Sequence, residues 1–414
     1  MTLRRSLCIS TLEGAFAELV GACAAGGVSA AWAIYLRLSP LLVGLLGALP
    51  FTALLVQLPT TRLSQRFGSR RTALWTIGIA RQCVLPLALL PFVDLDPGVK
   101  QAVFLGCALA GAALGVVGHT TWTTWMGELV PGAVRNRYFG RRATACALAT
   151  SVSSLAAGGI LDAGGRRGHA GAALSALAFT ASVAGALTTL LLRHQHPPHQ
   201  DRPQRRQAAP ARSRDPRARK LLAFEAAWSA AIGIAAAFYP IHMAQNLKMD
   251  FASMGLYGAG VAAIRMLTAP LWGRAIGRTG PRFALVSSAF ALSLSPLLWL
   301  FASPGRLWPL AIDAVISGAA GAGLALATFH LPLALARPRE RSSLLGTLAA
   351  AGGAATGLAS AAGGALVKGL PAAWTLAGRP LAALHGLFLV GAAGRFLAAL
   401  LGLRVEDRRL AQKL

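Results

Sequence analysis

Long apolar stretches alternate with short polar and basic ones along this chain. A helix needs roughly 20 apolar residues to cross a bilayer, because unpaired backbone amides are too costly in hydrocarbon. Windows of that length predict twelve membrane-spanning helices, at 11–36, 40–60, 72–92, 101–126, 143–163, 170–192, 221–243, 253–273, 283–302, 307–332, 344–367 and 381–403. The fifth and eleventh are rich in small residues, which indicates close helix packing. The predicted fold is an all-α polytopic membrane protein.

Composition supports the same class of protein. Only 13% of the 414 residues are charged, whereas soluble domains carry about 25%. The 40 basic and 14 acidic residues give a net charge of +26, which in a soluble protein would suggest a nucleic-acid partner. The basic residues instead form short clusters between apolar runs, so we predict no nucleic-acid partner.

The positions of these basic residues predict an orientation. With the N-terminus placed inside, the inner segments hold 29 Lys and Arg residues, the outer segments hold 8, and 3 fall within spans. Cytoplasmic segments carry the excess of Lys and Arg, so both termini are expected in the cytoplasm. The acidic residues Glu13 and Glu18 lie in the first apolar run, which therefore reads as a span and not as a cleaved signal peptide.

One long polar segment divides the chain. Residues 193–220 contain five prolines and nine basic residues, a composition that favours a disordered cytoplasmic linker. It separates an N-terminal six-helix half, 1–192, from a C-terminal half, 221–404, followed by a cytoplasmic tail, 405–414. The predicted architecture is thus two pseudo-symmetric six-helix bundles.

The two halves match at a constant offset of 212 residues. Three residues after the second span recur after the eighth: Arg66, Gly68 and Arg70 correspond to Arg278, Gly280 and Arg282. The same offset relates Glu13 to Glu225, although Glu occurs only six times in the chain. This correspondence indicates an internal duplication.

The repeated loop resembles the cytoplasmic motif G-x-x-x-D-R-x-G-R-R of the major facilitator superfamily. The first copy has Thr61 and Gln65 where the motif has Gly and Asp, and the second has Gly277 in place of the Asp. The motif Asp usually steadies one gating state, so that contact is expected to be weaker or remade elsewhere. The resemblance covers the whole chain and implies two bundles that rock around a central site.

A second motif of that superfamily resembles the segment after the fourth span. Glu128, Arg135 and Arg137 match its acidic and R-x-R positions. Short Arg-rich turns of this kind hydrogen-bond helix C-terminal carbonyls and acidic partners. We therefore predict gate or inter-half contacts for the residues of both motifs, against the alternative of mere positive-inside charge.

Charged side chains within spans are costly and usually functional or paired. The resemblance implies that spans one, four, seven and ten line the central cavity. The candidates for cavity lining or coupling are Glu18, His119, Trp122, Arg265 and Asp313.

Several of these residues have more than one interpretation. Asp313 is a proton site, a contact for a cationic substrate, or the partner of an arginine, while Arg265 binds an anionic substrate or neutralises Asp313. Trp122 and His119 line a cavity or, like Trp125, belong to an interfacial belt.

The remaining in-span charges favour structural contacts. Glu13 and Glu225 lie near the cytoplasmic boundary and are predicted to form ion pairs between the halves, with substrate binding as the alternative. Arg81 and Arg395 lie on helices that are peripheral in the superfamily, which favours packed ion pairs.

These features predict a secondary active transporter of a small, unidentified solute in the inner membrane of a bacterium. It would work by alternating access, coupled to protons through Glu18 or Asp313, as a monomer. No phosphate-binding loop and no metal-ligand spacing of the five cysteines is present, so no cofactor, metal or enzymatic activity is predicted. The alternative is a non-transporting sensor or scaffold with the same fold.

Overall fold

The computed structural model describes residues 3–52, 66–130, 132–195, 216–335, 341–371, 373–376 and 379–406. The end of the predicted second span and most of the predicted linker, residues 53–65 and 196–215, lie outside these ranges. The chain folds into two compact units. Unit 1 comprises Met1–Leu38, Thr52–Arg205 and Asp250–Leu256, and unit 2 comprises Ser39–Phe51, Arg206–Met249 and Tyr257–Leu414.

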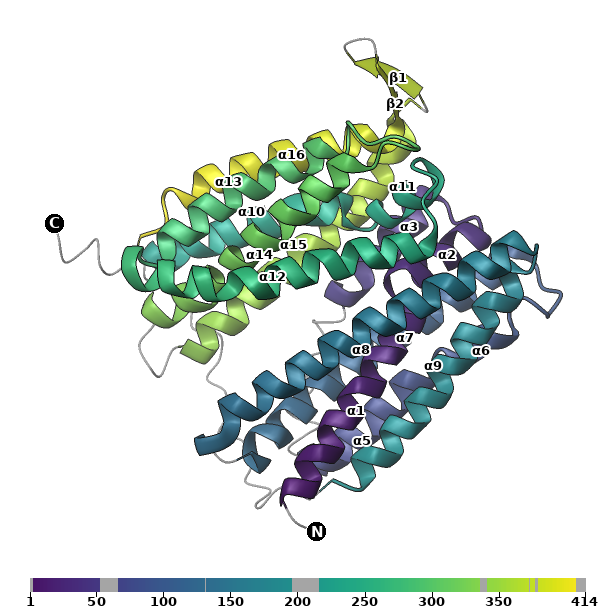
Figure 1. The fold of residues 1–414 in the computed structure, drawn as a ribbon, viewed down its shortest axis with the longest axis horizontal. Coiled ribbons are helices and arrows are strands. Elements are labelled where there is room, and N and C mark those ends of the chain that lie inside the picture. The colour runs from purple at the N-terminus through teal and green to yellow at the C-terminus, as the bar shows by residue number, and fades with distance from the viewer. Residues whose placement is uncertain are drawn as a thin grey trace. The chain divides into compact units, whose positions relative to one another are not determined.

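Unit 1 is built of helices (Figure 1). They are α1 (Leu3–Ala24), α2 (Gly26–Tyr35), α5 (Ser69–Gln82), α6 (Leu85–Leu89), α7 (Pro97–Leu129), α8 (Gly132–Arg166) and α9 (Ala170–Arg193). Helix α8 begins only three residues after α7 ends, so the motif segment after the fourth predicted span is helical.

Unit 2 is also helical except for one short hairpin. Its elements are α3 (Pro40–Thr52), α10 (Pro216–Ala236), α11 (Tyr239–Gln245), α12 (Phe251–Thr279), α13 (Pro281–Leu298), α14 (Trp308–Leu335), α15 (Arg341–Gly369), β1 (Ala373–Leu376), β2 (Arg379–Ala382) and α16 (Ala383–Gly402). The first residues of α12 belong to unit 1. Strands β1 and β2 pair in antiparallel fashion, with Ala373 opposite Ala382. No pattern in the sequence predicted this hairpin.

The predicted spans agree with the observed helices. Among the described residues, eleven helical segments are long and apolar enough to cross a membrane. The predicted second span begins with the apolar helix Pro40–Leu49 and continues outside the described residues. The all-α, two-repeat prediction is therefore confirmed. Helical structure also extends into the segment 193–220 predicted as linker, because α10 begins at Pro216, a residue favoured in the first turn of a helix.

The same helix pairing occurs inside each unit. In unit 1, α1 packs against α8 and α9, and α5 packs against α7 and α9. In unit 2, α10 packs against α15 and α16, and α13 packs against α14 and α16. The first span of each half thus contacts the fifth and sixth, and the third contacts the fourth and sixth, as a duplicated bundle requires.

Two spans are interrupted at equivalent positions. Span one breaks between α1 and α2, where Gly26 has a φ of 55°, and span seven breaks between α10 and α11, just before Pro240. Proline lacks the amide that would continue the helix. Interrupted spans at matching positions of two repeats often mark the binding region of a transporter.

Two short segments pack closely within units that sequence order does not suggest for them. In unit 2, a Cβ built on Gly44 of α3 would lie 2.5 Å from the backbone oxygen of Ser360 in α15. In unit 1, a Cβ built on Gly158 of α8 would lie 2.6 Å from the backbone of Phe251. The small residues predicted to permit close packing in the fifth and eleventh spans do so. Residues 39–51 and 250–256 consequently fall in units other than the halves 1–192 and 221–404 that sequence order suggests.

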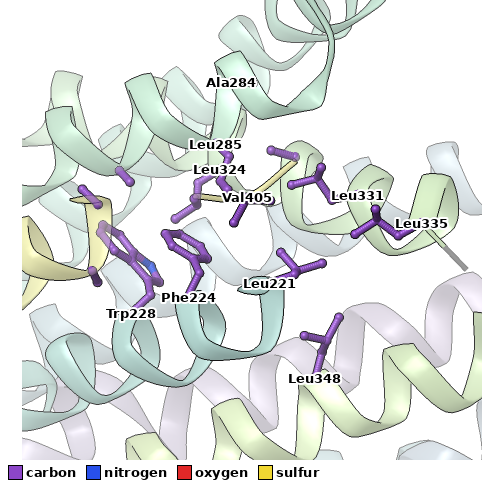
Figure 2. Packing of buried hydrophobic residues seen from close by; sticks show 14 of the residues in the cluster. Leu221, Phe224, Trp228, Ala284, Leu285, Leu324, Leu331, Leu335, Leu348 and Val405 are labelled. Atoms are coloured by element: carbon purple, nitrogen blue, oxygen red, sulfur yellow. The ribbon is translucent and has the colours of Figure 1, made fainter. Parts of the chain in front are cut away.

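An apolar core fixes unit 2 at one end of its helices. Phe224 and Trp228 of α10 stack with ring centroids 5.9 Å apart. Figure 2 shows Leu285, Leu331 and Leu348, from α13, α14 and α15, in the same cluster. In a membrane, close van der Waals packing of such side chains holds helices together, so this core supports the helices that carry the polar residues described next.

Candidate polar sites within the two units

A buried carboxylate organises the centre of unit 1. Glu13 of α1 is 2% exposed. Its Oε1 accepts a hydrogen bond from Arg81 of α5 at 2.8 Å, and its Oε2 accepts one from Arg142 of α8 at 3.4 Å. Two guanidinium groups therefore neutralise one acid, and the three residues fasten three helices to each other.

These contacts bear on two expectations from the sequence. The two described partners of Glu13 belong to unit 1, so its observed ion pairs lie inside one unit, and a contact between the halves stays a prediction. The packed ion pair predicted for Arg81 is confirmed. Sequence reasoning missed Arg142 as a member of this cluster because it placed the residue in a loop before span five, whereas α8 begins ten residues earlier, at Gly132.

One face of α8 lines the polar side of α1. Residues at i and i+4 share a helix face, and Arg142, Cys146 and Thr150 follow that spacing. The Thr150 hydroxyl donates a hydrogen bond of 2.7 Å to Oε2 of Glu18. No ion pair among the described residues includes Glu18, so this acid is hydrogen-bonded but not neutralised.

The predicted pair His119 and Trp122 continues this cluster onto α7. The Arg142 guanidinium lies 4.5 Å from the centre of the Trp122 ring, within cation–π range. The exposed His119 ring stacks on the same indole at 6.0 Å. Trp122 is thus an internal residue, 8% exposed. Trp125, predicted as an interfacial residue, is completely buried, because it packs against Ala73 and neighbouring apolar residues of unit 1.

A second buried carboxylate lies in unit 2, in different surroundings. Asp313 of α14 is 1% exposed. Its carboxylate accepts hydrogen bonds from the Tyr257 hydroxyl of α12, from Trp299 Nε1 at 3.2 Å and from Ser317 Oγ at 3.1 Å. No ion pair among the described residues includes Asp313. In the described part of the structure, three neutral donors bind this acid.

Two histidines and an aromatic group adjoin the indole that binds Asp313. His242 of α11 is completely buried, and neither ring nitrogen has a hydrogen-bond partner. Its ring meets that of His385 edge-on at 4.8 Å and that of Trp299 at 6.2 Å. Phe388 packs on His242 at 5.0 Å.

Sequence reasoning singled out Asp313 but missed Tyr257, because only the fold brings α12 beside α14 at this depth.

Among the described residues, neither Arg265 nor Arg395 forms an ion pair with Asp313. Arg265 is exposed and its guanidinium lies beside Gly321 of α14, so it does not neutralise Asp313, and its alternative role, binding an anionic substrate, stays a prediction. Arg395 is 8% exposed and donates to the Leu292 carbonyl at 3.3 Å. The ion pair predicted for Arg395 is therefore wrong, because a backbone oxygen of α13 takes the place of an acid.

The carboxylate of Glu225 lies in unit 2 beside Gly352 of α15. Among the described residues it forms no ion pair. Its duplication with Glu13 is thus a match in sequence position without a match in contacts, because α13 and α15 present no arginine where α5 and α8 present Arg81 and Arg142.

The repeated loop motif has the same geometry in both units. Gly68 and Gly280 have φ values of 82° and 88°, a backbone conformation that favours glycine. Each precedes a helix whose arginine binds the carboxyl end of the last helix of its own unit. Arg70 donates to the Arg193 carbonyl at 2.8 Å, and Arg282 donates to the Leu403 carbonyl at 2.6 Å.

The motif arginines Arg70 and Arg282 therefore close helix ends inside each unit, and the gate or inter-half contacts expected of them stay a prediction. Their partners are unpaired C-terminal carbonyls, which carry partial negative charge. The other motif arginines, Arg66 and Arg278, are exposed. Glu128, Arg135 and Arg137 lie in α7 and α8, and their side chains are outside the described part of the structure.

Eleven apolar helices of membrane-spanning length, arranged in two units with one internal pairing scheme, define a polytopic membrane protein. The family model of the Major Facilitator Superfamily matches residues 14–238 and again residues 226–413. The chain belongs to the Major Facilitator Superfamily. No protein of curated function matches the sequence significantly.

Solved transporter structures share this fold at low sequence identity. The nucleoside transporter NupG is 13% identical with a TM-score of 0.71, over 98% of this chain and 99% of that one. A bacterial homologue of the iron transporter ferroportin, inward-facing, is 14% identical with a TM-score of 0.73, over 98% and 99%. A D-xylose–proton symporter is 14% identical with a TM-score of 0.71, over 97% of each chain. The fold is therefore that of a transporter.

Proposed function

We propose that this protein is a proton-coupled secondary transporter of a small solute, and that Asp313 carries the coupling proton. The observation that supports this proposal is the burial of Asp313 among Tyr257, Trp299 and Ser317, without an ion pair among the described residues. An ionised carboxylate buried without a counter-ion costs several kcal/mol, and protonation removes that cost. A group in this situation binds a proton when it is occluded and releases it when water reaches it.

Of the two candidate proton sites, the surroundings favour Asp313 over Glu18. Glu18 is only half-buried and accepts one hydrogen bond, from Thr150, so its charged form is less costly.

The remaining features of the proposal follow from membership of the superfamily and from the distribution of Lys and Arg along the chain. The protein would act as a monomer in the inner membrane of a bacterium, with both termini in the cytoplasm, and without cofactor, metal or enzymatic activity. Among the similar folds, one is described as a proton symporter and one as a nucleoside transporter, so pentoses and nucleosides are the first solutes to test.

The test begins with a solute that raises the melting temperature of the purified protein. Proteoliposomes with an imposed pH gradient should then accumulate that solute. In Asp313→Asn, accumulation should fall by at least tenfold, a loss of about 1.4 kcal/mol of coupling, whereas exchange of labelled for unlabelled solute should continue.

Two variants act as controls in the same assay. Asp94→Asn alters an exposed loop acid and should leave accumulation unchanged. If Glu18→Gln uncouples transport and Asp313→Asn does not, the coupling site is Glu18. Accumulation that ignores the pH gradient in the unmodified protein would refute proton coupling, and the absence of any exchange would favour a sensor or scaffold.

A further inference from the structure

A groove runs between α5 and α9 on unit 1. It encloses about 1000 Å³ and has an apolar wall that includes Leu74, Ile79 and Leu190. Trp75, which also lines it, is 66% exposed, and Ile79 and Leu190 are about half exposed. Side chains of this kind on a membrane-spanning bundle contact hydrocarbon, so the wall of the groove suits an acyl chain.

Three arginines gather at one end of this groove. Arg70, Arg71 and Arg193 all line it, and no acidic residue does. Among the described residues none of the three forms an ion pair. Arg70 uses one nitrogen to bind the Arg193 carbonyl, while its buried Nε has no partner. The end of the groove is therefore a concentration of positive charge that its own residues do not neutralise.

The repeated loop motif accounts for only one of these arginines. At the offset of 212, Arg70 corresponds to Arg282, but Arg71 corresponds to Phe283 and Arg193 to Val405. Unit 2 thus closes the end of its last helix without the two additional charges. Arg71 and Arg193 are features of the groove and not of the duplicated motif.

We propose that this groove binds one anionic phospholipid of the surrounding bilayer. Arg71 and Arg193 bind the phosphate, since guanidinium groups bind phosphate oxygens in bidentate fashion. One acyl chain lies along Leu74, Ile79 and Leu190. A free phosphate would satisfy the arginines but leave the apolar wall unused, and an apolar helix would cover the wall but leave the charge unpaired.

Native mass spectrometry of the full-length protein in detergent tests this site. The probes are phosphatidylglycerol, phosphatidylcholine and inorganic phosphate, each added at equal concentration. The unmodified protein should retain one phosphatidylglycerol in preference to phosphatidylcholine. In the double variant Arg71→Ala/Arg193→Ala that preference should fall about tenfold or more, since each arginine near a membrane surface contributes measurably to anionic lipid binding.

Two further variants separate the groove from simple charge attraction. Ala186→Phe fills the apolar part of the groove and should abolish retention of the lipid without removing charge. Arg166→Ala/Arg167→Ala removes two exposed arginines that do not line the groove and should change nothing. The proposal is refuted if both double variants lower the preference equally, if Ala186→Phe has no effect, or if inorganic phosphate binds as well as the lipid.

Discussion

At the scale of single residues, the two buried acids Glu13 and Asp313 differ in their neighbours. Two guanidinium groups neutralise Glu13, whereas only neutral donors reach Asp313. Removing one partner of a buried ion pair leaves an uncompensated charge, whereas an acid bonded only by neutral donors has no ion pair to lose. The first arrangement stabilises a bundle, and the second is where we propose that the coupling proton binds.

We predict that Glu13→Gln destabilises the protein by about 3–5 kcal/mol, because Arg81 and Arg142 would lose their shared counter-ion. Glu18→Gln should cost about 1 kcal/mol, since it alters one hydrogen bond, from Thr150. Denaturant unfolding of the purified protein measures both. Equal effects of the two substitutions would contradict the assignment of Glu13 as the neutralised acid.

At the scale of elements, the starts and ends of helices carry much of the sequence signal. Gly68 and Gly280 both permit a positive φ before a helix, and Arg70 and Arg282 both close the end of another. Helix α12 begins with two acidic contacts: Asp250 binds the Ser253 amide at 2.9 Å, and Asp162 of α8 binds the Phe251 amide at 2.8 Å. Such caps satisfy first-turn amides that have no helical partner.

Substitution of the motif glycines should be costly because of their backbone conformation. Gly68→Ala and Gly280→Ala are each expected to destabilise by about 1–2 kcal/mol, the cost of a Cβ at positive φ. Gly140→Ala is the control, because Gly140 lies in α8 with nothing within 4 Å of an added Cβ, and there alanine should stabilise by about 0.5–1 kcal/mol. Thermal melts in detergent measure these shifts, and a stabilising Gly68→Ala would be inconsistent with the observed turn.

The cap of α12 should depend on pH. Hydrogen bonds from the hydroxyl and the amide of Ser253 lower the pKa of Asp250 below its usual 3.8. Because the folded-state pKa is lowered, the cap stabilises the protein at pH values above the unfolded-state pKa. This stabilisation is lost as the pH falls through the folded-state pKa. Asp250→Ala should therefore cost about 1 kcal/mol at pH 7, and its difference from the unmodified protein should disappear in strong acid. The exposed loop residue Asp94 provides the comparison, since Asp94→Ala should show no such cost at pH 7.

At the scale of the whole molecule, two properties characterise the chain: the distribution of its basic residues and its internal repeat. The excess of basic residues predicts an orientation, and the shared pairing scheme of the two units confirms the repeat. The segments 39–51 and 250–256 group with the unit that sequence order does not suggest, because Gly44 and Gly158 permit close backbone contact.

The orientation is tested by labelling with a membrane-impermeant maleimide in intact cells. In a variant without the five native cysteines, Ser303→Cys, in the exposed turn after α13, should react at once. Ser213→Cys, in the predicted cytoplasmic linker, should react only after the membrane is permeabilised. The reverse pattern would overturn the orientation predicted from the Lys and Arg counts.

The sequence by itself determined the membrane class, the positions of the spans and the duplication. These properties depend on local composition and on a constant offset, and both are visible without contacts. It also indicated Asp313 and Arg81, because a charge within an apolar run is unusual wherever it lies.

Only the tertiary structure decided which charges neutralise each other. Arg142 reaches Glu13, Tyr257 reaches Asp313, and Arg265 reaches neither acid. Each outcome depends on which face of a helix meets its neighbour and at what depth, and helices distant in sequence set both. An ion pair is therefore a property of packed helices, whereas a membrane span is a property of a single segment.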